Sequence, residues 1–173
     1  AEHGIEVWSV NEGQQKFEHH VDKLMNYIRF WQASGESEKT SIRVKTRLQQ
    51  MTEDGIYTGG AVPFGYTLTY NGRKNKKGQE MRDLAIEPSE AELVRKIFSM
   101  TVNEGYGSHQ LAEYANNAGF ITHNGAEFQS NTIRRILKNE IYIGYIVNGE
   151  ARSDRIESLR LISDEDFNFT QEI

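Results

Sequence analysis

The strongest constraint on the fold is an apolar repeat near the start of the chain, which suits one face of a single long helix. The repeat consists of Phe17, Val21, Leu24, Ile28 and Trp31. Steps of three and four residues place these side chains in one stripe, as in a coiled-coil seam. Because no proline occurs before position 63, the pattern predicts a helix over about residues 14–50 that frays or kinks at Gly35. We expect this face to pack against a partner helix or another domain.

The segments on either side of this helix predict strands. Residues 4–10 alternate apolar and polar side chains and predict one strand, whose partners we expect in a sheet formed elsewhere. Four glycines and Pro63 in residues 55–66 end the helix and predict a linker. After the linker, residues 64–70 and 82–88 predict a long hairpin around the basic loop 71–79.

Helical periodicity returns in the second half of the chain. It predicts helices over residues 90–103, 109–119 and 131–139, and a last short helix that opens at Ser163. Serines are the predicted N-caps of the first three helices: Ser89, in a capping box with Glu92, then Ser108 and Ser130. An Asn-Gly pair predicts a tight hairpin over residues 120–128. Residues 140–149 predict a strand, with 157–163 as its candidate partner.

The helices at 109–119 and 131–139 resemble a helix-turn-helix with an enlarged turn. The second helix begins with small polar residues and carries Arg134 and Arg135. A recognition helix enters the major groove by its N-terminal part, where such side chains reach base edges and phosphates. Its N-terminus also favours phosphate. The alternative is an amphipathic helix whose polar face holds three cations, and the residues alone leave that alternative open.

Charge is distributed unevenly along the chain. The net charge is −5, yet residues 39–82 hold nine basic and three acidic residues. A cationic segment inside an acidic chain indicates a polyanion-binding surface, although a solvated charged face is the alternative.

Composition limits the other kinds of site. The absence of cysteine excludes a disulfide scaffold and a thiolate zinc site within the chain. The five histidines show no ligand spacing, and the serines fall at helix surfaces or predicted caps. We therefore predict no metal, no cofactor and no catalytic residue. No apolar run approaches the roughly 20 residues of a membrane helix, so no membrane partner is predicted.

Several longer motifs resemble the large serine recombinase family of phage integrases and transposon recombinases. "GIEVWSV" and "SEKTSIRVKTRL" resemble the last strand of the family's catalytic domain and its long exit helix. "DGIYTGGAVPFGY" resembles the junction that opens its recombinase domain, and "LAIEPSEAELVRKIFSM" with "GYGSHQLAEYANNAGFITHNGAEFQSNTIRRILKNEIYIGYI" resembles the body of that domain. The chain departs from the family at Phe128, where a Trp is usual, and at Glu140, where a Pro is usual. "LISDEDFNFTQEI" resembles the segment that leads into a Cys-rich zinc ribbon.

This resemblance implies an α+β fold, with a long N-terminal helix followed by a small helix-turn-helix-like domain with β-hairpins. Residues 1–54 would be the end of the catalytic domain and its exit helix, 55–66 the junction, 67–150 the DNA-binding domain, and 151–173 the connection to a further domain. The nucleophilic serine motif has no match here, so we expect a piece of an enzyme that is inactive alone. A winged-helix transcription regulator with a dimerising helix and a helical adaptor that binds only protein are the alternatives.

The resemblance also implies partners and a binding surface. We expect double-stranded DNA, a homo-oligomer through the long helix (a dimer, and a tetramer in the parent synapse), and a cytoplasmic, nucleoid-associated protein of bacterial or phage origin. The expected sequence-reading group is Ser130, Asn131, Thr132, Arg134 and Arg135, and Lys138 is a further expected DNA-binding residue. The expected phosphate-holding group is Arg43, Arg47, Arg73, Lys74, Lys76 and Lys77, with Gly59 and Gly60 in close approach to the backbone of the DNA.

Overall fold

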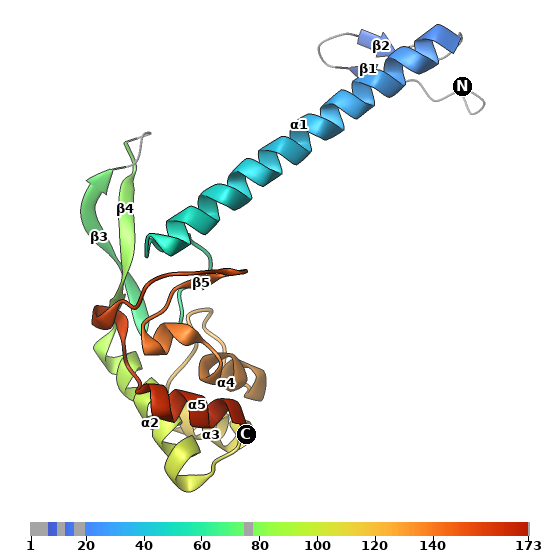
Figure 1. Ribbon diagram of the computed structural model, residues 1–173. Helices are drawn as coiled ribbons and strands as arrows, with labels where there is room; N and C mark the ends of the chain where they lie inside the picture. Colours follow the sequence, from blue (N-terminus) through green and yellow to red (C-terminus); the bar gives the residue numbers. More distant parts are fainter. Residues whose placement is uncertain (1–6, 10–12, 16–19, 75–77, 173) are drawn as a thin grey trace. The chain divides into compact units, whose positions relative to one another are not determined.

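The computed structural model describes residues 7–9, 13–15, 20–74 and 78–172, which form an α+β chain as predicted. Two compact units are present, Ala1–Arg47 and Leu48–Ile173. The first holds strands β1 (Val7–Ser9) and β2 (Gly13–Gln15) and most of helix α1 (His20–Glu53) (Figure 1). The second holds the last turn of α1 and every later element.

The beginning of the first unit differs from the sequence prediction. Strand β1 pairs with β2 in an antiparallel hairpin, with Val7 opposite Gln15, so the prediction that its partners lie elsewhere is wrong. Because Gly13–Gln15 is a strand, helix α1 begins at His20 and not near residue 14. Phe17 lies outside the described residues.

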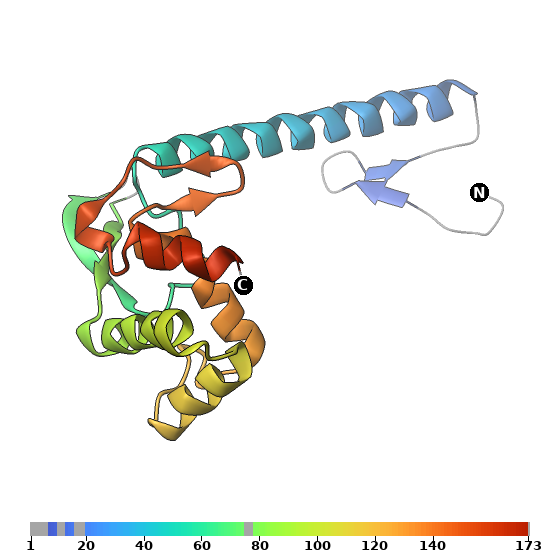
Figure 2. The same ribbon diagram turned by 60° about the horizontal axis from the view of Figure 1, so that its bottom comes forward.

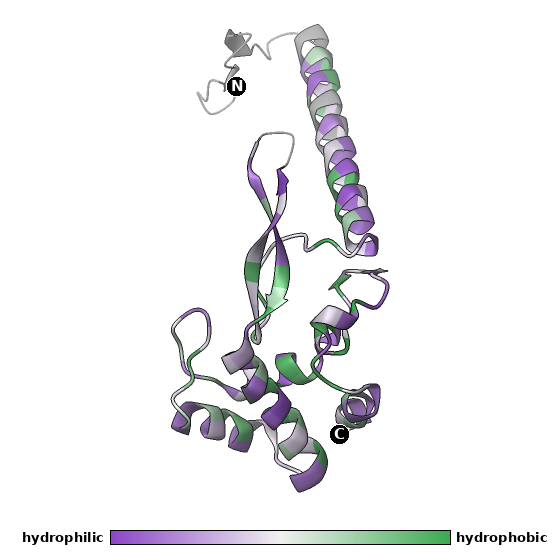
Figure 3. Cartoon of the chain, turned by 90° about the vertical axis from the view of Figure 1, so that its left-hand side faces the viewer, coloured by the Kyte–Doolittle hydropathy of each residue, from purple (hydrophilic) through white to green (hydrophobic). Residues whose placement is uncertain are grey.

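Helix α1 is continuous through Gly35 and ends at Glu53, so the predicted fraying at Gly35 does not occur. Polar and apolar residues are interspersed along it (Figure 3). The predicted seam is exposed where its side chains are described: Leu24, Ile28 and Trp31 are 60%, 41% and 77% exposed. In its last turn, the buried Thr52 hydroxyl donates to the Leu48 carbonyl at 2.9 Å.

The linker leads into the predicted hairpin, which is confirmed. Strands β3 (Tyr66–Lys74) and β4 (Glu80–Ile86) pair antiparallel, with Tyr66 opposite Ile86 and Tyr70 opposite Arg82. Tyr66 anchors the base of the hairpin, because its hydroxyl donates to the carbonyls of Leu159 at 2.6 Å and Ile141 at 3.1 Å. Burial raises the pKa of the Tyr66 hydroxyl above its ordinary value, so it remains a donor at neutral pH.

Four helices complete the core of the second unit: α2 (Pro88–Glu104), α3 (Ser108–Asn117), α4 (Ser130–Leu137) and α5 (Asp164–Glu172). Helix α5 lies beside α2 in both views (Figures 1 and 2), with the Phe98 and Phe167 rings stacked at 6.2 Å. As predicted, α2 ends at Gly105 and α3 is followed by Gly119, both with positive φ.

The three predicted serine caps are displaced, whereas the last helix opens at Ser163 as predicted. Ser163 caps α5, because its hydroxyl accepts the Asp166 N–H at 3.1 Å. Ser89, Ser108 and Ser130 instead lie within their helices, whose N-caps are Glu87, Gly107 and Gln129. In α2 the fixed φ of Pro88 already suits the first helical position, so the helix begins one residue before Ser89.

Three predicted strand segments fold otherwise. Residues 120–128 form a tight turn, in which Gly125 N–H donates to the Thr122 carbonyl at 2.8 Å, without flanking strands. Residues 140–149 open with the 3-10 helix η1 (Glu140–Ile143) and only then form β5 (Val147–Asn148), which pairs with β6 (Ala151–Arg152). The segment 157–163 contains the 3-10 helix η2 (Glu157–Leu159). Three consecutive apolar residues of η1 are buried, which a half-exposed strand cannot achieve.

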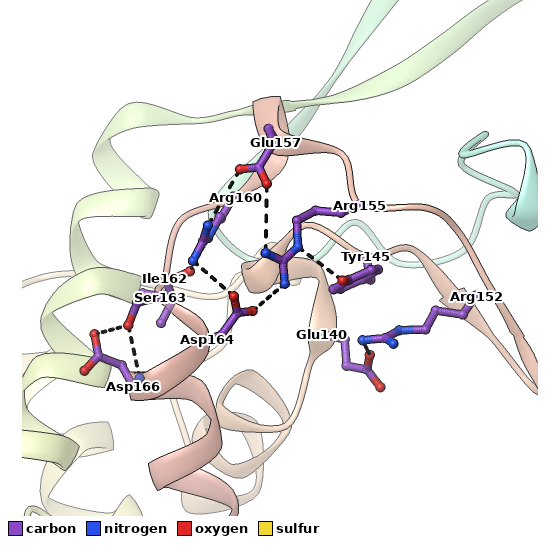
Figure 4. Close-up of polar contacts among 10 residues, drawn as sticks. All are labelled: Glu140, Tyr145, Arg152, Arg155, Glu157, Arg160, Ile162, Ser163, Asp164 and Asp166. Carbon is purple, nitrogen blue, oxygen red and sulfur yellow. Dashed lines mark hydrogen bonds and ion pairs between the residues drawn. The ribbon is translucent and has the colours of Figure 1, made fainter.

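The segment after β6 is fixed to α5 by a network of arginines and carboxylates (Figure 4). Arg155 donates to Asp164 at 2.6 Å and to the Tyr145 hydroxyl at 3.2 Å. Arg160 bonds the same carboxylate at 3.4 Å, and Arg152 pairs with Glu140 at 2.7 Å. These cations are therefore committed to contacts within the chain.

Candidate nucleic-acid interface

Helices α3 and α4 pack together as the helix pair that the sequence predicted (Figure 2). Ile133 and Ile136 of α4 are buried, at 0% and 5% exposure, and lie in the same apolar cluster as Leu111 and Ala115 of α3. This packing turns the opposite face of α4 outward. The exposed residues on that face are Asn131, Arg134, Arg135 and Lys138.

One side chain of α3 bonds the end of the segment between α3 and α4. Asn116 of α3 accepts the Phe128 N–H at 2.7 Å and donates to the Phe128 carbonyl at 3.0 Å. Phe128 itself is 3% exposed and packs edge-on against Phe64 of the linker, with ring centroids 5.0 Å apart. The position where α4 begins is thus determined jointly by α3 and the linker.

A groove of about 1110 Å³ runs along the outer face of α4. One wall is the linker segment 61–64, and another is α4 with the turn that precedes it. Glu140, Tyr142 and Val147, from the segment after α4, complete the lining. The residues of α4 and its C-cap that line the groove include Asn131, Thr132, Arg134, Arg135 and Lys138. Ser130, the remaining member of the expected sequence-reading group, is half-buried and is not in the lining. The structure therefore gathers five of the expected residues along one groove with the linker.

The cations of α4 differ from the three arginines that follow them between residues 151 and 160. Among the described residues, no carboxylate pairs with Arg134, Arg135 or Lys138, whereas Arg152, Arg155 and Arg160 all have acidic partners. An exposed ion pair is worth little, but an unpaired arginine has all five of its N–H donors available to an external anion. The first turn of α4 also lacks a side-chain cap. This face is suited to bind phosphate or a base edge.

The expected phosphate-holding residues are spread over several elements. Arg43 and Arg47 are exposed on α1, in the first unit. Arg73 lies on β3 and pairs with Asp83 at 3.5 Å, while Lys74 beside it is exposed. Lys76 and Lys77 lie outside the described residues.

Gly59 and Gly60 have φ of +100° and +99°, and a Cβ at either position would meet nothing within 4 Å. The linker backbone there is exposed and has the positive φ angles that favour glycine.

Sequence reasoning missed the other parts of the groove. Val62, His123, Asn124 and Gln129 also line it, contributed by the linker and the turn before α4. The Asn-Gly pair marked a turn in the sequence, but nothing local indicated that this turn faces the linker.

In the described part of the chain, no group of three or more His, Asp or Glu residues is placed to hold a metal ion. None of the described helices is long and apolar enough to cross a membrane.

Comparison with known proteins gives two kinds of likeness. Residues 88–173 match the family model named Recombinase. Among solved structures, the chain is similar to one described as the crystal structure of an LSR–DNA complex, with a TM-score of 0.53 and 21% identity over 75% of this chain and 36% of that one. A second, from work on the sequence requirements of the Listeria innocua prophage attP site, has a TM-score of 0.52 and 21% identity over 75% of this chain and 50% of that one. This chain thus spans between about a third and a half of those proteins.

Proposed function

This chain belongs to the large serine recombinase family through its Recombinase domain at residues 88–173, and we propose that it binds double-stranded DNA at half of a recombination site and holds it for strand exchange. One observation carries the proposal most directly. The unpaired cations and small polar residues of α4 line a single groove together with the linker. The description of a similar structure as an LSR–DNA complex supports the same ligand.

The chemistry of the groove suits a duplex. Arginine donates two parallel hydrogen bonds to guanine or to phosphate, and asparagine pairs with adenine through one donated and one accepted hydrogen bond. Arg134, Arg135 and Asn131 are exposed on α4 and offer these donors. We assign them to sequence reading, with Thr132 and Ser130 at the helix start. Arg43, Arg47 and Lys74, together with the glycine backbone at Gly59 and Gly60, are assigned to phosphate contacts that carry no sequence information.

The proposed function also assigns roles to the other segments of the chain. Residues 1–54 would be the last part of a catalytic domain and its exit helix, 55–66 the junction, 67–150 the DNA-binding domain, and 151–173 a connection to a further domain. The exposed seam at Leu24, Ile28 and Trp31 supports a homo-oligomer through α1. Chemistry belongs to the rest of the parent enzyme, which we place with bacterial or phage DNA in the cytoplasm.

Binding of single alanine variants tests the division between the two groups. A duplex selected by the wild-type chain from a randomised library and a scrambled duplex of equal length serve as probes, each at several salt concentrations. Arg134→Ala or Arg135→Ala should cost about 1–3 kcal/mol on the selected duplex and much less on the scrambled one. Lys74→Ala should weaken both equally and lower the slope of log affinity against log salt by about 1.

Two results would contradict the proposal at different levels. If both arginine variants retain the full preference for the selected duplex, α4 is not the reading helix. If the wild-type chain selects no sequence and shows no salt dependence, duplex binding itself is refuted.

A further inference from the structure

Glu90, in the first turn of α2, bonds both the end of the linker and the turn that precedes α4. One carboxylate oxygen accepts the Gly65 N–H of the linker at 2.9 Å. Both oxygens lie 2.9 Å from Nε2 of His123, in the turn that precedes α4. The Glu90 side chain is 19% exposed and is not part of the groove lining. A residue outside the groove lining thus joins two segments next to the groove.

The backbone at the linker contact leaves little freedom. Gly65 has φ of +95°, and a Cβ there would lie 3.2 Å from Val94 Cγ2. The next residue toward the N-terminus, Phe64, packs its ring against His123 and Phe128 with centroids 5.6 and 5.0 Å away. The linker therefore contacts the turn before α4 in two ways, through the Phe64 ring and through the hydrogen bonds of Glu90. Hydrogen bonds to a carboxylate are stronger than those between neutral groups.

We infer that Glu90 is a positioning residue that sets the spacing between the linker and helix α4, and through it the spacing of the two sets of DNA contacts. The inference rests on the proposed function. On B-DNA, one base pair is a step of about 3.4 Å and about a tenth of a turn. An inserted base pair between the two targets therefore moves one target away from its contact element. Two rigidly joined elements cannot follow that shift and should bind such a site more weakly. If the junction is loosened, each element can follow its own target.

The experiment measures spacing selectivity in the whole 173-residue chain. The probes are the duplex selected by the wild-type chain and a series in which one base pair is inserted at each successive position within it. We expect the wild-type chain to lose about tenfold or more in affinity at insertions between the linker and α4 contacts, comparable with a mismatched pair. Glu90→Ala and His123→Ala should bind the uninterrupted duplex more weakly, and their insertion penalty should shrink to about threefold or less.

Matched variants separate positioning from other effects. Glu90→Gln keeps an acceptor for the Gly65 N–H and should retain most of the penalty. Glu92→Ala removes the same charge from an exposed site on the same helix and should behave as wild type. His123 is exposed, so His123→Ala should leave the core intact. It therefore provides the test if Glu90→Ala fails to fold.

The outcomes are distinct. If folded His123→Ala and Glu90→Ala show the same insertion penalty as the wild-type chain, the inference is overturned, while DNA binding stands. A wild-type chain without any insertion penalty also overturns it, because the linker and α4 then do not read one site together. A wild-type chain that selects no duplex refutes the proposed function instead.

Discussion

Asn116→Ala should weaken the attachment of α4 to α3 and lower the stability of the second unit. The side chain accepts the Phe128 N–H at 2.7 Å and donates to the Phe128 carbonyl at 3.0 Å. Alanine removes both bonds and offers no replacement, and Phe128 is only 3% exposed. Its backbone groups would then lose their protein partner in a place that water reaches poorly.

The expected magnitude follows from these two bonds. Each contributes about 0.5–1.5 kcal/mol net, so their loss costs about 2 kcal/mol. Alanine is the better helix former in α3 and offsets about 0.5 kcal/mol of that loss. The free energy of unfolding should therefore fall by about 1.5 kcal/mol, which lowers the melting temperature by about 3–6 °C for a protein of this size.

Urea and thermal unfolding followed by far-ultraviolet circular dichroism measure this difference. Asn117→Ala is the matched control, because Asn117 is the next residue of α3, is exposed and makes no side-chain hydrogen bond with the described residues. It should leave stability unchanged or raise it slightly. Equal stability of the two variants would refute the argument that Asn116 holds the start of α4.

Three further outcomes are expected. Gly65→Ala should destabilise the fold more than Gly60→Ala in thermal unfolding, because both have φ near +100° but only a Cβ at Gly65 would meet Val94, at 3.2 Å; equal losses would contradict the contact argument. Leu24→Glu combined with Ile28→Glu should abolish self-association in analytical sedimentation, since both exposed side chains lie on the predicted seam, and a wild-type chain that is already monomeric at high concentration would count against an α1-mediated oligomer. The chain alone should form no covalent adduct with its selected duplex on denaturing gels; an adduct that survives denaturation would show that it carries its own nucleophile.

The sequence alone determined the elements whose signals are local. The long helix, the hairpin after the linker and the buried face of α4 at Ile133 and Ile136 all follow from side-chain periodicity, which acts within a few residues. Gly105 and Gly119 marked the ends of α2 and α3 because positive φ favours glycine whatever lies nearby. The family resemblance rested on these same local motifs.

Short apolar runs carried no such signal, and there the tertiary structure decided. The apolar run at residues 141–143 is compatible with a strand or with a 3-10 helix. The 3-10 helix allows all three side chains to be buried in the core at once. Sequence also could not distinguish the unpaired arginines of α4 from the paired Arg155 and Arg160. That difference depends on whether a carboxylate from another segment, such as Asp164, comes within reach.

The groove itself depended entirely on the tertiary structure. Glu90 lies 25 residues from Gly65 and 33 from His123 along the chain, yet it contacts both at 2.9 Å. No periodicity or turn rule acts over such separations, because they are closed only when the linker, α2 and the turn before α4 pack around Phe64. The sequence thus specified which side chains are suited to DNA, and the packing of distant segments decided which of them face one groove.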